Sequence, residues 1–259
     1  MTTAKPEFIS VEQGSQDWLD LRKTKITATD SCVIMRSLHW KTPTQLYHQK
    51  LSDTEQYTPN ERMLRGTALE PVARDLFNMT TGKTMVPKVV VRGWAMASLD
   101  GINEAGEILE IKCPGDKDHA IALAGKVPAH YYPQLQHQMH VCDSQKVYYY
   151  SFDGFDGVVV EVARDDAYIE KMLKEEEKFY QCLMTRTPPE QSENEYVERM
   201  DEEWNTWATR WTTVSSQMKQ LEKEEEELRK QLIALSGSSN CKGAGISLCQ
   251  VQRKGNVEY

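Results

Sequence analysis

The pattern that most constrains the fold is a block of short β-prone runs in the middle of the chain, with helical patterns on both sides. Turns that contain Gly, Asn and Asp separate these runs. The expected strands are Lys88–Val91, Met96–Leu99, Ile108–Ile111, Lys146–Phe152 and Val158–Val162. Strands and helices in this order favour a central mixed sheet flanked by helices, in an α/β or α+β domain.

Hydrophobic residues at helical spacing predict the helices around this sheet. The first pattern after Gln16 is followed by Thr27–Asp30, whose Thr and Asp side chains suit a helix N-cap. Pro43 suits the first turn of a further helix. The expected helices are Gln16–Lys23, one from the Thr27–Asp30 caps to Met35, Thr44–Gln49, Asn60–Met79, Ala129–Val141 and Asp166–Met184. We therefore expect the first domain to span residues 1–189.

The composition of the chain excludes several classes of protein. No run approaches the roughly 18 apolar residues of a membrane span, and the N-terminus lacks a signal-peptide core, so we expect a cytoplasmic protein without membrane contact. The six cysteines contain no CxxC pair, which favours free thiols over a zinc knuckle or a disulfide framework. The net charge of −8 disfavours general DNA binding. A metal nuclease nevertheless concentrates carboxylates at its site and can hold DNA with a local basic strip.

The tail at residues 190–259 has a different pattern. Residues at spacings of three and four form a heptad seam that is apolar apart from one glutamate. The seam consists of Trp204, Trp207, Trp211, Val214, Met218, Leu221, Glu225, Leu228, Leu232 and Leu235. We expect this helix to stop at Gly237 and a terminal hairpin over residues 246–259 to turn at 254–256. The seam could pack on its own domain, form a subunit contact or dock a partner protein.

Asp100, Glu110 and Lys112 give the strongest chemical signal. Asp100 closes one β-prone run, and the other two residues stand two apart on the next. Side chains two apart on a strand share a face, and a hairpin can bring Asp100 beside them. Two carboxylates and an ammonium are unfavourable together unless a divalent cation joins them. Mg²⁺ prefers such oxygen ligands, and the Ile111 carbonyl is a further candidate ligand.

The alternative interpretation is an exposed Glu–Lys pair, which contributes at most about 1 kcal/mol. Two neighbouring side chains favour the metal site instead. Glu70 on the preceding helix can approach the metal, and Gln134 near a helix start can orient a water or a phosphate. Taken separately, a solvated helix glutamate and a surface amide remain alternatives for these two residues.

Two other patterns are weaker. His137 and His140 have a spacing that can hold zinc, but no matching Cys/His pair accompanies them, so we expect ordinary histidines. The run Tyr148–Tyr150 could stack on nucleic-acid bases. In a strand, however, alternate tyrosines usually pack on the core, which is the interpretation we favour.

Considered together, the motifs resemble the YqaJ-like viral recombinase family, to which bacteriophage lambda exonuclease belongs. The resemblance runs from about residue 10 to 185, and it depends on the order of the motifs more than on any one of them. The motifs are Trp18-x-x-Leu21-Arg22, Ile26-Thr27-Ala28-Thr29, Arg65-Gly66…Glu70, Ser98-Leu99-Asp100-Gly101, Leu109-Glu110-Ile111-Lys112-Cys113-Pro114 and Tyr131-x-x-Gln134-x-Gln136.

This resemblance implies a restriction-endonuclease-like PD-(D/E)xK core that degrades one strand of linear double-stranded DNA from 5′ to 3′. It implies Mg²⁺, expected as two ions with Mn²⁺ as a substitute, a homotrimeric ring around the DNA, and a partner that anneals the exposed single strand. The resemblance assigns metal binding to Asp100, Glu110 and Ile111, and assistance of the attacking water to Lys112. Glu70, Gln134 and Tyr131 would lie nearby.

The resemblance also assigns a pocket for the 5′-phosphate. Arg22 matches the family's phosphate-binding arginine, and Thr29 stands where the family has a serine, which keeps the hydroxyl. A guanidinium suits a terminal phosphate. The alternative is a surface arginine within the basic run Arg22–Lys25.

Two other functions remain open. The same core could serve a structure-specific DNA endonuclease, whereas the scattered cysteines disfavour a RecB-like nuclease with an iron–sulfur cluster. The chain could instead be a DNA-end-binding scaffold without catalysis. The intact set of Asp100, Glu110 and Lys112 argues against a scaffold, because a negative cluster facing phosphates is of no use to a binding protein.

Overall fold

The computed structural model describes residues 4–52, 61–191, 199 and 201–249. The chain divides into two compact units, Met1–Glu195 and Tyr196–Tyr259. Among the described residues, no helix combines the length and the apolar character needed to cross a membrane. All six cysteines are free thiols.

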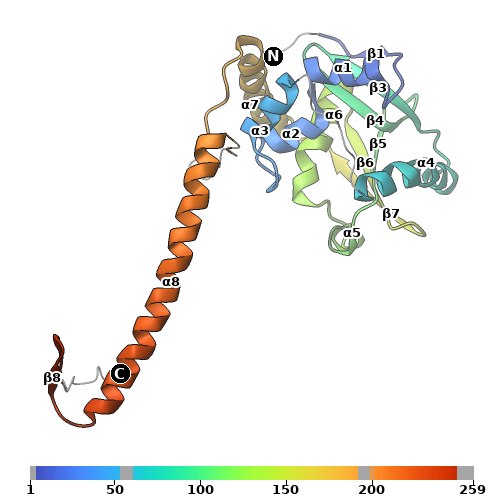
Figure 1. Ribbon diagram of the computed structural model, residues 1–259. Coiled ribbons are helices and arrows are strands. Elements are labelled where there is room, and N and C mark those ends of the chain that lie inside the picture. Colours follow the sequence, from blue (N-terminus) through green and yellow to red (C-terminus); the bar gives the residue numbers. More distant parts are fainter. Residues whose placement is uncertain (1–3, 53–60, 192–198, 200, 250–259) are drawn as a thin grey trace. The chain divides into compact units, whose positions relative to one another are not determined.

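Within the described residues, the first unit contains a seven-stranded mixed sheet (Figure 1). The strands are β1 (Glu7–Ile9), β2 (Ile26–Thr27), β3 (Val86–Arg92), β4 (Ala95–Ile102), β5 (Ile108–Lys112), β6 (Lys146–Phe152) and β7 (Gly157–Ala163). The order is β1-β3-β4-β5-β6-β7, with β2 paired to β4. The β5–β6 and β2–β4 pairs are parallel and the others are antiparallel. A parallel pair needs a crossover connection, which is why helices separate β5 from β6 in the sequence.

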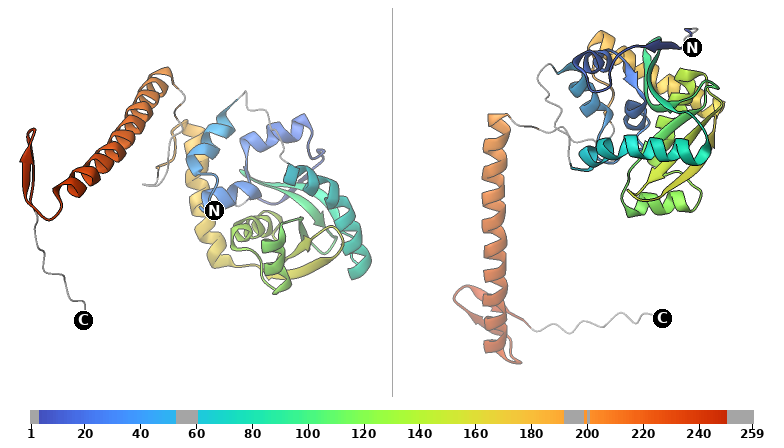
Figure 2. Two further views of the ribbon diagram at one scale, coloured as in Figure 1. Left: turned by 60° about the horizontal axis from the view of Figure 1, so that its bottom comes forward. Right: turned by 90° about the vertical axis from the view of Figure 1, so that its right-hand side faces the viewer.

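Helices cover both faces of this sheet (Figures 1 and 2). They are α1 (Gln16–Thr24), α2 (Ala28–Ile34), α3 (Pro43–Leu51), α4 (Glu61–Thr81), α5 (Asp116–Leu123), α6 (Tyr132–Cys142) and α7 (Asp166–Thr185). Helix α6 shares a core cluster with Ile108, and α4 shares another with Leu109. Because successive residues of a strand point to opposite faces, α6 and α4 lie on opposite faces of β5.

The predicted fold class is confirmed, and every predicted strand and helix of this unit is present. The cap residues fit the prediction, since Thr27 forms a capping box with Asp30 at the start of α2. The predicted helix start at Asn60 lies outside the described residues. The Tyr148–Tyr150 run is buried in β6, as expected for a strand between two packed layers.

The prediction was wrong in two respects. It missed β1, β2 and α5, which are short and lack a clear hydrophobic period. It also began a single helix at Ala129, where the structure has a 3₁₀ turn, Ala129–Tyr131, before α6 starts. Pro133 explains the break, because proline is tolerated in the first turn of an α-helix and not further along.

Within the described residues, the second unit consists of α8 (Glu202–Ser236) and the hairpin of β8 (Cys241–Gly243) and β9 (Ile246–Leu248). The Asp201 side chain caps α8 by accepting from the Trp204 amide. Gly237, at φ 59°, ends the helix where the sequence predicted. The turn predicted at 254–256 lies outside the described residues; the hairpin that is described turns earlier, at Ala244 and Gly245.

Candidate active site

The separation of β4 from β5 positions Asp100. These two antiparallel strands pair only from Ile102 to Gly101, and Gly101 faces Leu109. Past this point the Ile111 amide donates its hydrogen bond to Asp100 Oδ2, at 2.7 Å. A carboxylate therefore replaces the backbone partner that a longer ladder would supply, and this holds Asp100 against the middle of β5.

Glu110 lies at the centre of the site, with 2% of its surface exposed. Lys112 Nζ lies 2.5 Å from Glu110 Oε1. Gln134 Nε2 donates to the same oxygen and Gln138 Nε2 donates to Oε2, both at 2.5 Å. The sharing of one face by Glu110 and Lys112, expected from their spacing on a strand, therefore holds. A buried carboxylate is tolerated here because it is both paired and hydrogen-bonded.

The sequence analysis missed Gln138. It stands four residues after Gln134 on α6, and residues at that spacing lie on the same face of a helix. The signal was therefore present in the spacing once Gln134 had been assigned to the site.

Arg74 was missed as well. Its Nη1 donates to Glu70 Oε1 at 3.0 Å and to the main-chain oxygen of Asp100 at 2.7 Å. Glu70 and Arg74 are one turn apart on α4, so this helix supplies a carboxylate and a guanidinium to the same end of β4. The structure thus connects Glu70 with Asp100 through Arg74.

The electrostatics of the site depend on crowded carboxylates. Burial, followed by repulsion from Glu110 and Glu70, raises the pKa of Asp100 well above its ordinary value. Burial alone would lower the pKa of Lys112, but the charges of Glu110 and Asp100 outweigh it and raise that pKa. Lys112 is therefore held as a cation. Ionisation of Asp100 stays unfavourable because Glu110 and Glu70 are close to it.

Tyr131 lies beside the lysine. Lys112 Nζ is 5.2 Å from the centre of its ring, which is within the range of a cation–π contact. The Tyr131 ring also tilts against Tyr149 of β6, with 5.9 Å between their centres. The position that the sequence predicted for Tyr131, near the catalytic cluster, is the position that the structure shows.

The donor set fits a hard divalent cation. Asp100 and Glu110 supply carboxylate oxygens next to the Ile111 main chain, and the raised pKa of Asp100 marks negative charge that a cation would relieve. Within the described residues, no group of three or more His, Cys, Asp or Glu side chains is arranged to hold a metal alone. Mg²⁺ suits such a sparse set, because it uses one or two carboxylates together with waters and substrate phosphate.

Arg22 and Thr29 lie in a second region, at the junction of α1 and α2. The Arg22 guanidinium stacks on Trp18, 4.4 Å from the ring centre, and Thr29 is exposed. Burial would raise the pKa of Asp30, but Lys50, paired at 2.7 Å, and Arg22 lower it. Arg22 therefore lies close to the first turn of α2, whereas no contact joins it to the Asp100–Lys112 cluster.

The histidines of α6 are buried and serve the fold. His137 Nδ1 lies 2.8 Å from Glu176 Oε1 of α7, and Ser31 Oγ of α2 donates to the same oxygen at 2.5 Å. His140 follows on the same helix, and Arg92 and Arg164 lie near it. Neither histidine belongs to a metal-binding group within the described residues.

His140 gives a prediction about pH. Burial first, and the nearby cations His137, Arg92 and Arg164 next, lower the pKa of His140 to about 3. Between pH 6.5 and 3 the unfolded chain binds a proton here that the folded chain does not, so stability is lost as the pH falls through this window. When the pH is lowered from 7.5 to 5, the unfolding free energy should fall in both proteins. We expect the fall to be about 2 kcal/mol smaller in the His140→Gln protein than in the wild type.

Urea unfolding at both pH values measures this difference. His39→Gln is the matched control, because His39 is exposed. If the unfolding free energy of the His140→Gln protein and of the wild type falls equally on acidification, then His140 does not stay neutral in the folded protein as expected.

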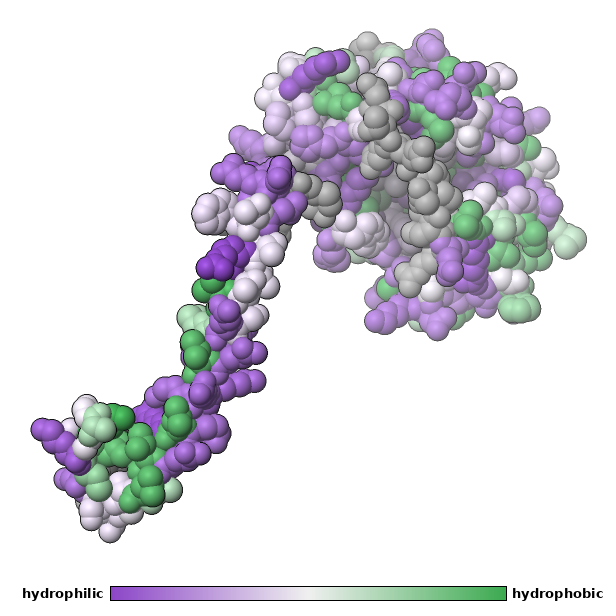
Figure 3. All heavy atoms as spheres, viewed as in Figure 1, coloured by the Kyte–Doolittle hydropathy of each residue, from purple (hydrophilic) through white to green (hydrophobic). Residues whose placement is uncertain are grey.

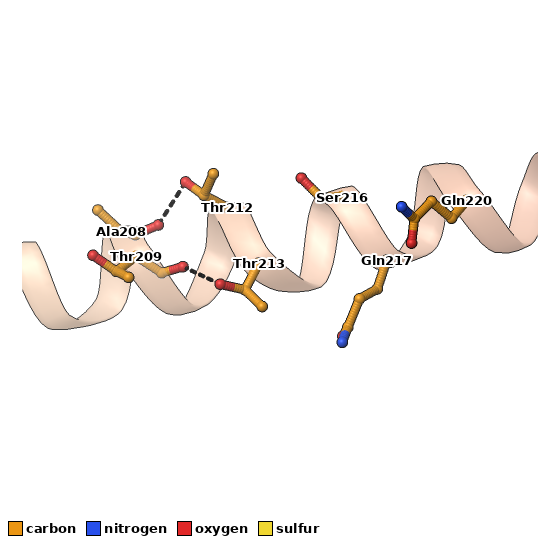
Figure 4. Close-up of a pocket in the computed structure, with 7 residues that line it drawn as sticks. All are labelled: Ala208, Thr209, Thr212, Thr213, Ser216, Gln217 and Gln220. Carbon is orange, nitrogen blue, oxygen red and sulfur yellow. Dashed lines mark hydrogen bonds between the residues drawn. The ribbon is translucent and has the colours of Figure 1, made fainter.

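A shallow hollow along α8 is the pocket drawn in Figure 4. It is lined by Ala208, Thr209, Thr212, Thr213, Ser216, Gln217 and Gln220. Thr212 and Thr213 already donate their hydroxyls to carbonyls one turn earlier. The lining contains no ionisable group.

Comparison with known proteins relates the part of the chain that carries the site to a family. Residues 17–145 match the family described as "YqaJ-like viral recombinase domain", and this stretch includes Arg22, the Asp100–Lys112 cluster and Gln134. The uncharacterised protein YqaJ of Bacillus subtilis (strain 168) is 26% identical over 193 residues, which cover 70% of this chain. The match covers 60% of that curated relative's own length.

Solved structures give the same fold. The alkaline exonuclease LHK-Exo of Laribacter hongkongensis is 27% identical, with a TM-score of 0.59; the match covers 67% of this chain and 94% of that protein. The same enzyme in complex with dAMP matches equally well. The mixed sheet flanked by helices is thus the restriction-endonuclease-like fold.

Proposed function

Because this chain carries a domain of the YqaJ-like viral recombinase family, we propose that it is a DNA exonuclease. Its substrate is linear double-stranded DNA, of which it hydrolyses one strand from 5′ to 3′ with Mg²⁺. The observation that carries the proposal is the cluster of Asp100, Glu110 and Lys112 on β4 and β5. The fold shared with an alkaline exonuclease supports a nuclease on this scaffold.

The roles follow from the contacts of each group. Asp100, Glu110 and the Ile111 carbonyl would hold Mg²⁺, two ions being expected from the family resemblance. Mn²⁺ could substitute, since the set offers only oxygen donors. When bound, the metal supplies Lewis acidity toward the phosphate and toward water. Lys112, held as a cation beside Glu110, orients the attacking water and neutralises charge that develops on the phosphate.

The surrounding side chains keep this arrangement in place. Gln134 and Gln138 fix both oxygens of Glu110, and Arg74 holds Glu70 near Asp100. Tyr131 covers Lys112 and limits its motion. Such support is what keeps catalytic groups oriented before the substrate arrives.

Digestion of one strand would leave a 3′ single-stranded overhang. That product suits recombination by strand annealing, with a single-strand annealing protein as the partner and a homotrimeric ring around the DNA as the assembly. These features are proposed from the family to which the domain belongs.

Arg22 and Thr29 are proposed to receive the 5′-phosphate of the DNA end. The guanidinium lies over the Trp18 ring, and such a group can form two parallel hydrogen bonds to phosphate. We expect Arg22→Ala to lower the preference for 5′-phosphorylated over 5′-hydroxyl ends by about tenfold or more, mainly through KM.

Initial rates on duplexes that differ only in the 5′ group measure this preference. Lys23→Ala, an exposed neighbour, is the control that should keep it. Equal wild-type rates on the two ends would contradict the pocket.

The experiment that tests the proposed function follows nucleotide release from linear double-stranded DNA labelled at either the 5′ or the 3′ end. The wild type is compared in Mg²⁺ and in EDTA, with covalently closed circular DNA as the control. Early, Mg²⁺-dependent release of the 5′ label and no action on circles would support the proposal. Cleavage of circles would indicate an endonuclease. No cleavage of any DNA by folded protein would indicate an end-binding scaffold.

A further inference from the structure

The face of α8 that carries the heptad seam is exposed along its whole length. None of the described side chains of this 35-residue helix is buried, and Trp211 and Leu221 are 72% and 64% exposed. Figure 3 shows hydrophobic side chains gathered along one side of α8. An isolated helix draws little stability from propensity alone, so a helix with such a face needs a partner for it.

The spacing of the seam specifies the type of partner. Its residues alternate at intervals of three and four without interruption, which fixes a repeat of 3.5 residues and selects another helix wound around α8. The first heptad position is occupied by Trp204, Trp211, Met218, Glu225 and Leu232. The fourth position is occupied by Trp207, Val214, Leu221, Leu228 and Leu235.

We propose that α8 pairs with α8 of a second copy of this chain as a two-stranded antiparallel coiled coil. In the proposed register Trp211 faces Leu228 of the second copy, Met218 faces Leu221 and Val214 faces Glu225. The two helices then overlap over the whole seam, about 50 Å at the helical rise per residue. The interface belongs to α8 alone and does not depend on the proposed nuclease function. Because three helices related by a three-fold axis cannot pair two by two, each α8 of the proposed ring would pair with a chain of another ring.

The sizes of the seam residues favour this orientation. The three tryptophans lie in the first half of α8 and three leucines lie in the last part, at Leu228, Leu232 and Leu235. An antiparallel pair places each tryptophan opposite a leucine. A parallel pair would place tryptophan against tryptophan at one end and leucine against leucine at the other, which fills the space between the helices unevenly.

Charge favours the same orientation. In a parallel pair Glu225 would face Glu225 of the second copy inside the seam, next to the run Glu224–Glu227 of both chains. Like charges buried together are strongly unfavourable. In the antiparallel register Glu225 faces Val214 of the second copy instead, so the two glutamates are kept apart.

Disulfide trapping in the full chain tests the proposal. Two proteins are made in a background of Cys241→Ser and Cys249→Ser, one with Val214→Cys and the other with Glu225→Cys. In the proposed register these two positions meet, whereas Glu225 of one chain lies about 16 Å along the axis from Glu225 of the other. We expect a covalent dimer under mild oxidation when the two proteins are mixed and none when either is oxidised alone.

Two results would overturn the proposal. A covalent dimer from the Glu225→Cys protein alone would show a parallel pair. No covalent dimer in any arm, while circular dichroism shows the helix intact, would show that a second copy does not cover the seam.

Discussion

Replacing Lys112 with glutamine is expected to slow nucleotide release from linear DNA by about 10²- to 10⁴-fold. The substitution removes the cation that lies 2.5 Å from Glu110 and beside Tyr131, but leaves an amide able to donate to the carboxylate. Alanine at this position should lose as much activity and also stability, because Glu110 would then lack its cation. Comparing the two variants therefore separates loss of chemistry from loss of fold.

Initial rates under saturating Mg²⁺ and thermal unfolding of the same preparations measure both effects. Lys117→Gln is the matched control, since Lys117 is exposed on α5, five residues further along the chain. A folded Lys112→Gln protein that retains near-wild-type rates would remove Lys112 from the proposed chemistry.

Asp100→Asn is expected to abolish nucleotide release and to remove the stabilisation of the fold by metal. The pKa of Asp100 is raised in the folded chain, so its ionisation opposes folding once the pH exceeds the ordinary carboxyl value of about 4. At neutral pH and without metal, the asparagine variant should therefore be at least as stable as the wild type. Asparagine can still accept the hydrogen bond from Ile111.

Thermal unfolding in EDTA and in Mg²⁺ measures the stabilisation by metal in each protein. At about ten times its dissociation constant, Mg²⁺ should stabilise the wild type by about 1.4 kcal/mol and raise the melting temperature by about 3–6 °C. The variant should show no such rise. Asp75→Asn, at an exposed position of α4, is the control. An equal rise in the Asp100→Asn protein would place the metal elsewhere.

The sheet and the centre of the site were predictable because both depend on short-range patterns. Alternation along a strand places Glu110 and Lys112 on one face, whatever the rest of the chain does. Helix caps likewise act within a few residues: the predicted cap at Thr27 forms a capping box, and so does Thr42 at the start of α3.

The remainder depends on tertiary packing that no local pattern encodes. The spacing places Gln138 on the same helix face as Gln134, but only the packing of α6 over β5 brings that face to Glu110. Arg74 contacts Asp100 through a main-chain oxygen, a group that every residue has. Strand β2 has two residues and exists because β4 offers it a parallel edge.

The crossover between β5 and β6 has a consequence for the order in which the site matures. Gln134 and Gln138 follow Glu110 by 24 and 28 residues, on the far side of α5. While the chain is being synthesised, β4 and β5 are complete before these amides exist, and Glu110 remains an ordinary hydrated carboxylate. The site is therefore assembled only when α6 docks on the sheet, so an incomplete chain cannot carry it and the proposed nuclease activity would mark a fully folded domain.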